Sequence, residues 1–185
     1  YITINISSPN TEGLRDFHNQ EKLKDLIKSL NKIKKENKSI IPLALKISPD
    51  INDDYISEIT DVAIKNDISA IILTNTSIGN RGNLLSEIKN ETGGLSGEPI
   101  QKISTNMIKK FYRKLGNKIP IIGVGGINSG KSAYEKIIAG ASLLQLYTGL
   151  IYKGPSVVKN IKKELVKILK DEGISNIKDA VGKEV

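Results

Sequence analysis

Two hydrophobic periodicities alternate along the chain. Short runs rich in β-branched residues predict strands, and stretches with an apolar residue every third or fourth position predict helices. The predicted strands are 1–7, 41–47, 70–74, 120–124 and 142–147. The apolar stripes that follow them lie within 23–33, 56–63, 103–115, 133–138 and 157–169. The chain is therefore predicted to contain about five β/α units.

The fourth helix is marked at both ends. Ser129 precedes it as the predicted N-cap, and Gly140 follows it as the predicted stop. Its position between two predicted strands supports the β/α order.

The strands are continuously apolar, which is typical of parallel strands covered on both faces. A complete eight-unit barrel needs about 250 residues, so 185 residues fit part of one. A partial β/α (TIM) barrel also explains why polar or glycine residues follow every strand, because these positions would meet at one mouth. They are Asn5, Lys46, Thr74 with Asn75, Gly125 with Gly126, and Tyr147 with Thr148.

Composition excludes several kinds of site. The chain has no Cys and one His, His18, which argues against a zinc site, a catalytic triad and any metal-binding role. The net charge is +8, but only three of the basic residues are Arg, so solvated lysines explain the charge better than a nucleic-acid partner.

No apolar run reaches the roughly 18 to 20 residues that cross a bilayer, and no signal peptide is visible. These features predict a soluble chain of the cytoplasm or an organelle. Tyr1 already belongs to a strand expected to be buried, so we expect the chain to be a piece of a larger protein.

Polar side chains gather after the first strand, where Ser7, Ser8, Asn10 and Thr11 follow one another closely. Ordinary turn chemistry explains this composition equally well. Asn5 is different, because it lies inside an apolar strand, where an unpaired amide costs free energy. An amide there suits recognition of a planar, amide-rich ligand.

Lys46 follows the apolar run Leu43–Leu45 near the end of the second strand. It could extend to solvent, stabilise an electron-rich ring, or act as a Schiff-base amine.

Thr74, Asn75 and Thr76 form a second polar cluster at a strand end, where they could also cap a turn. The glycine-rich stretch 77–97 is long for a connecting loop, and such loops are usually functional. Gly-Gly at 125–126 and Thr-Gly at 148–149 predict a phosphate cradle, although glycines can serve turns alone.

In this order the motifs resemble dihydroorotate dehydrogenase of the second, quinone-dependent class. The motifs are NISSPNT, Lys46, TNT, GGLSG at 93–97, IIGVGG at 121–126, and AGAS at 139–142 with Tyr147 and Thr148. The resemblance implies that residues 1–185 are the C-terminal part of one flavin mononucleotide (FMN) barrel domain, about the last five of eight units. The family oxidises dihydroorotate to orotate in pyrimidine biosynthesis and passes electrons through FMN to a quinone.

The resemblance also assigns roles. Ser8 would be the general base, Thr11 its proton relay, and 8–20 a lid. Substrate contacts would come from Asn5, Asn10, Asn75 and Thr76. Lys46 and Thr74 would contact the flavin ring, with Asn5 serving both ligands. The phosphate cradle would comprise Gly97, Gly126, Tyr147 and Thr148.

The family's N-terminal strands and membrane-associating helices lie outside this chain. The resemblance implies a peripheral protein of the bacterial or mitochondrial inner membrane, and we expect the isolated five units to be inactive. Two alternatives remain open at this stage. One is a Schiff-base aldolase or phosphosugar isomerase using Lys46, and the other is a non-catalytic binding fragment.

Overall fold

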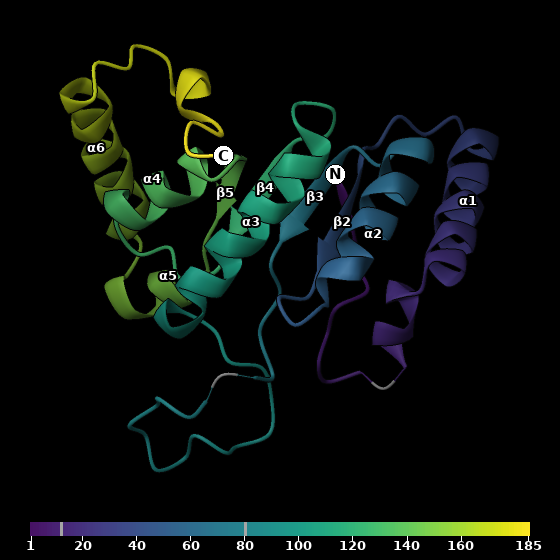
Figure 1. Cartoon of the computed structure of the whole chain (residues 1–185), viewed down its shortest axis with the longest axis horizontal. Coiled ribbons are helices and arrows are strands. Elements are labelled where there is room, and N and C mark those ends of the chain that lie inside the picture. Colours follow the sequence, from purple (N-terminus) through teal and green to yellow (C-terminus); the bar gives the residue numbers. More distant parts are fainter. Residues whose placement is uncertain (12, 80) are drawn as a thin grey trace.

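A five-stranded parallel sheet forms the centre of the computed structural model, with helices across one face (Figure 1). The model describes residues 1–11, 13–79 and 81–185, without the side chains of Arg15 and His18. The strands pair in sequence order. They are β1 (Ile2–Asn5), β2 (Leu43–Ile47), β3 (Ala70–Leu73), β4 (Ile121–Val124) and β5 (Ala141–Gln145).

Six α-helices and three short 3-10 helices lie between and after these strands in the described part of the chain. The α-helices are α1 (Gln20–Glu36), α2 (Asp53–Lys65), α3 (Gln101–Leu115), α4 (Gly130–Ile138), α5 (Thr148–Lys153) and α6 (Ser156–Asp171). The 3-10 helices are η1 (Leu14–His18), η2 (Glu98–Ile100) and η3 (Ile177–Ala180). None of the described helices is both long and apolar enough to span a membrane.

The fourth predicted helix forms as expected. The Ser129 side chain accepts a hydrogen bond from the Ser132 backbone N–H, and the Ser132 side chain accepts one from the Ser129 backbone N–H, which makes a capping box. Gly140 follows the helix with a φ of 117°, a conformation that favours glycine.

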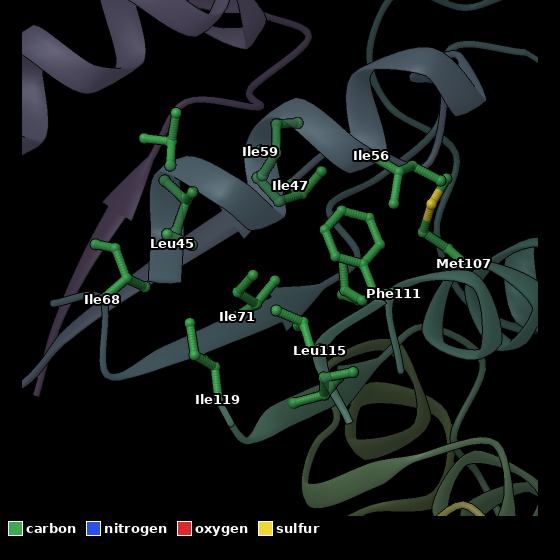
Figure 2. Close-up of a cluster of buried hydrophobic side chains, with 14 of the residues drawn as sticks. Leu45, Ile47, Ile56, Ile59, Ile68, Ile71, Met107, Phe111, Leu115 and Ile119 are labelled. Carbon is green, nitrogen blue, oxygen red and sulfur yellow. The ribbon is translucent and has the colours of Figure 1, made fainter. Parts of the chain in front are cut away.

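The main core lies between the sheet and helices α1, α2 and α3 (Figure 2). The Phe111 ring of α3 is fully buried and lies near Ile71 of β3 in this cluster. On the opposite face of the sheet, Ala44, Ile72 and Ile122 form a smaller cluster. Strand alternation places Lys46 on that second face, two residues beyond Ala44.

The edge strands correct one expectation. We expected every strand to be covered on both faces, but the Ile2 side chain of β1 is 52% exposed and Leu143 of β5 is 59% exposed. The reason is that β1 and β5 each pair with one neighbour only. All five strands are also shorter than predicted, because backbone pairing stops before the ends of the apolar runs: β1 ends at Asn5 although the buried Ile6 follows it, and β5 ends at Gln145, before Leu146.

Candidate active site

The loops after the strands form a cleft at the carboxyl end of the sheet. Its lining comes from the ends of β2, β3, β4 and β5 and from the loop before α3. The residues include Lys46, Thr74, Asn75, Thr76, Ser96, Gly97, Val124, Gly125, Gly126, Tyr147, Thr148 and Gly149. Eight of the predicted site residues are therefore brought together here, although they are spread over about 100 positions of sequence.

Asn5 joins this cleft through a hydrogen-bonded network rather than through its lining. Asn75 Nδ2 donates to Asn5 Oδ1 at 3.1 Å and to Ser7 Oγ at 3.0 Å. Ser7 Oγ in turn lies 2.8 Å from the Lys46 carbonyl oxygen. The Asn5 Nδ2 group donates to no residue in the described part of the chain, so it is free to meet a ligand.

Ser8 and Thr11 lie together on the loop after β1. Ser8 Oγ accepts hydrogen bonds from the Thr11 hydroxyl at 3.4 Å and from the Asn10 backbone at 3.3 Å. No carboxylate contacts Ser8 among the residues that the structure describes. Thr11 is exposed, so the Ser8–Thr11 hydrogen bond lies at the solvent-facing side of this loop. The expected lid at 8–20 includes Glu12, which lies outside the described residues.

Lys46 presents a half-buried cation to the cleft. Leu45 and Ile47 point to the helix-covered core, so alternation turns the Lys46 side chain to the opposite face. Burial lowers its pKa because desolvation disfavours the ammonium form. Lys46 Nζ has no hydrogen bond or ion pair within the described ranges, so the site lacks the acceptor that such a group needs.

Thr74 adds a second unsatisfied group beside Lys46. Its backbone N–H donates to the Val124 carbonyl at 2.9 Å, but the buried Thr74 Oγ1 has no hydrogen-bond partner. Buried hydroxyl groups are nearly always paired in native proteins. The cleft is thus ready for a ligand that offers acceptors to Lys46 and a hydrogen-bonding atom to Thr74.

Three glycine-containing segments close one end of the cleft. A Cβ at Gly97 would lie 2.8 Å from Thr148 Cγ2, and one at Gly126 would lie 2.5 Å from Gln101 Cβ. Both glycines have positive φ, at 80° and 74°. The absent side chains let the backbone N–H groups of these turns approach an anion closely.

The loop at 77–97 packs against the loop that follows β1. The Arg81 guanidinium donates to the carbonyl oxygens of Lys89, Glu91 and Gly93. A Cβ at Gly94 would overlap Thr76 and would lie 3.1 Å from Pro9. Gly94 therefore fits between the two loops only because it has no side chain.

The whole arrangement matches a known protein family. A family model described as dihydroorotate dehydrogenase matches residues 1–169. The chain belongs to the dihydroorotate dehydrogenase family. The family is flavin-dependent, and the unpaired Lys46 ammonium and Thr74 hydroxyl beside a glycine cradle fit a flavin.

Two curated relatives illustrate the similarity. The dihydroorotate dehydrogenase (quinone) of Parvibaculum lavamentivorans is 43% identical over 185 residues, covering 100% of this chain and 52% of its own length. The mitochondrial dihydroorotate dehydrogenase (quinone) of Arabidopsis thaliana is 43% identical over 188 residues, covering 98% of this chain and 41% of its own length. The chain spans about half the length of the curated relatives it matches.

A solved structure gives the same result for the fold. Dihydroorotate dehydrogenase of Eimeria tenella in complex with ferulenol superposes with a TM-score of 0.95 at 37% identity, covering 100% of this chain and 54% of that one. The predicted partial β/α barrel is confirmed. The comparisons give no support to an aldolase, an isomerase or a non-catalytic fragment.

The sequence did not indicate several residues that support this cleft. Ser7 lies two positions after Asn5, and strand alternation could have placed both on one face. Ser96 accepts a hydrogen bond from the Thr148 hydroxyl at 2.9 Å, a long-range contact with no local signal. Gln101 and Lys136 support the glycine cradle from behind, as described below.

Proposed function

We propose that this chain supplies the flavin- and substrate-binding part of a quinone-dependent dihydroorotate dehydrogenase. The observation that carries the proposal is that the half-buried Lys46 ammonium and the buried, unsatisfied Thr74 hydroxyl share one cleft with a glycine cradle. The Asn5 and Asn75 amides lie at the same strand ends. A planar ring system with a phosphate tail requires this combination of groups.

FMN is the flavin that we assign to the site. Lys46, Thr74 and Asn5 would hold its ring, and Gly97, Gly126, Tyr147 and Thr148 would hold its phosphate. When bound, FMN accepts the hydride that the substrate loses from C6. The Lys46 ammonium favours negative charge on the neighbouring ring, because an opposite charge in a partly desolvated site is stabilising.

Ser8 would remove the other hydrogen as a proton. Oxidation to orotate takes a proton from C5 and two electrons with the C6 hydrogen, which forms the C5–C6 double bond. Ser8 Oγ takes the C5 proton, and Thr11 Oγ1 carries a proton onward to solvent. Asn5, Asn10, Asn75 and Thr76 orient the ring, since amides and hydroxyls complement its carbonyl and N–H groups.

Electrons would then leave to a quinone at a membrane surface. The relatives named above carry the word quinone in their names, and the Arabidopsis relative is mitochondrial. We infer a peripheral location on a bacterial or mitochondrial inner membrane. The contact would involve a region of the full-length protein outside this chain, whose 185 residues form the C-terminal part of the barrel domain.

An anaerobic visible spectrum of the full-length protein tests the activity. We expect a flavin absorption band that bleaches when dihydroorotate is added. The Ser8→Ala variant should keep the band but bleach at least a hundredfold more slowly, since a positioned base contributes about 10²–10⁴-fold.

Ser29→Ala is the matched control. Ser29 lies on the exposed face of α1, where its hydroxyl donates to the Asp25 carbonyl oxygen. The flavin band of the Ser29→Ala variant should bleach at the wild-type rate. A protein that binds no flavin, or one that dihydroorotate leaves oxidised, would contradict the proposed function.

A further inference from the structure

A fully buried lysine lies behind the glycine cradle. Lys136 of α4 is 0% exposed. Its Nζ donates to Thr105 Oγ1 at 3.0 Å, Ser104 Oγ at 3.1 Å and the Gln101 carbonyl oxygen at 3.4 Å. All three acceptors are neutral groups at the start of α3. They use the three N–H donors of an ammonium, and no carboxylate contacts Nζ in the described part of the chain.

The nearest carboxylate is engaged elsewhere. Glu135 Oε2 accepts a hydrogen bond from Gln101 Nε2 at 2.7 Å, and Lys136 forms no ion pair in the described part of the chain. On α6, Glu164 accepts from the Gly130 backbone N–H. Burial lowers the pKa of Lys136 to about 7, and Glu135 acts in the opposite direction. The ammonium is therefore charged below neutral pH.

The residues that accept hydrogen bonds from Lys136 also support the Gly125–Gly126 turn. Ser104 Oγ donates to the Val124 carbonyl oxygen at 2.6 Å, and a Cβ at Gly125 would lie 3.0 Å from Ser104 Cβ. Gln101 lies closer still behind Gly126, where a Cβ would lie 2.5 Å from Gln101 Cβ. One layer of side chains thus separates the ammonium from the turn that lines the cleft.

A buried charge without a counter-ion destabilises a fold, and an apolar side chain of similar length would fill the same space at lower cost. An anion bound on the other side of the turn would offset that cost. The protein between the Lys136 ammonium and the anion screens charges less than water does, so the two charges attract each other through the intervening layer of side chains.

We propose that Lys136 is a positioning residue that makes the Gly125–Gly126 turn selective for a flavin carrying a phosphate. The inference rests on the proposed function, because it assumes that the cradle holds the FMN phosphate. Lys136 does not touch the ligand. It holds the start of α3 against the turn and supplies a positive charge behind it.

Binding of FMN and riboflavin to the full-length apoprotein tests this role. Riboflavin has the same ring but no phosphate, so the ratio of the two dissociation constants isolates the phosphate. Both are measured by flavin fluorescence quenching at pH 6.5. We expect Lys136→Met to weaken FMN binding about tenfold, or about 1.4 kcal/mol, and to leave riboflavin binding unchanged.

Two further variants separate charge from folding. Lys136→Gln keeps hydrogen-bond donors without the charge and should lose the same selectivity, even where Lys136→Met folds poorly. Lys110→Met removes a lysine of α3 that is 44% exposed and paired with Asp53, and it should keep the wild-type ratio.

The outcomes are distinguishable. A wild-type protein that binds FMN no better than riboflavin would contradict the phosphate site and the cofactor assignment. A wild-type preference that persists in both Lys136 variants would overturn the role of Lys136 alone. An equal weakening of both flavins would also overturn it, because that result indicates a purely structural lysine.

Discussion

Replacing Lys136 with Met should change how the stability of the protein depends on pH. Burial lowers the pKa of Lys136 to about 7 in the folded state, from an ordinary value of 10.5. Unfolding exposes the ammonium and restores the ordinary pKa. Between these two values the unfolded chain binds more protons, so the folded state gains stability as the pH rises. Below about pH 7 both states are protonated and the contribution is constant.

The size of the effect follows from the two pKa values. Between the folded-state and the unfolded-state pKa, each pH unit changes the unfolding equilibrium constant by up to tenfold. Because the folded-state lysine is half deprotonated near pH 7, the gain between pH 7 and pH 9 is about 2 kcal/mol. Lys136 is fully buried, so water does not screen this difference. Methionine has no titrating group, and the variant loses the gain.

Urea unfolding of the full-length wild type and Lys136→Met at pH 7, 8 and 9 measures the difference directly. Other titrating groups are common to both proteins and cancel. The wild type should gain about 2 kcal/mol relative to the variant across this range. A difference that stays constant with pH would refute the reasoning, because it would mean that Lys136 keeps an ordinary pKa in the folded protein.

Three other perturbations address the core, the cradle and the open sheet. Phe111→Ala should lower the free energy of unfolding by about 3–5 kcal/mol, since the ring is fully buried, and a loss below about 1 kcal/mol in urea unfolding would contradict the packing. Gly126→Ala should reduce the amount of bound flavin at least tenfold, measured by absorbance, because φ is 74° and the new Cβ would meet Gln101. Gly82→Ala is the control: the space around Gly82 is open, so this variant should bind flavin normally. The 185-residue chain alone should lose flavin on gel filtration, because β1 and β5 leave apolar side chains exposed, and a full flavin complement would disprove this.

Local signals in the sequence were sufficient for most of the fold. Ser129 and Gly140 marked the ends of α4 because capping depends on neighbouring residues alone. The strands were recognisable because apolar runs are typical of parallel sheets. The exposure of Leu143 was not predictable, because it depends on which strands lie beside β5.

The site was predictable where a polar residue interrupts an apolar strand. Asn5 and Lys46 stood out for this reason, and the structure places both at the carboxyl end of the sheet. Lys136 did not stand out, because a lysine after a glutamate in a helix is typical of a solvated surface. Its burial arises from packing against Ser104 and Thr105, more than 30 positions earlier. The roles assigned to the site residues remain predictions.

The Arg81 side chain divides the 77–97 loop into two mechanically separate parts. By binding carbonyl groups from Lys89 to Gly93, the guanidinium closes the intervening residues into a ring. Insertions or deletions at 82–88 would change the size of that ring and leave the hydrogen bonds from Arg81 in place. Gly94, wedged between Thr76 and Pro9, would keep its position. Residues 82–88 are therefore free to diverge in sequence and length, while the Arg81 contacts and Gly94 preserve the shape of the cleft mouth.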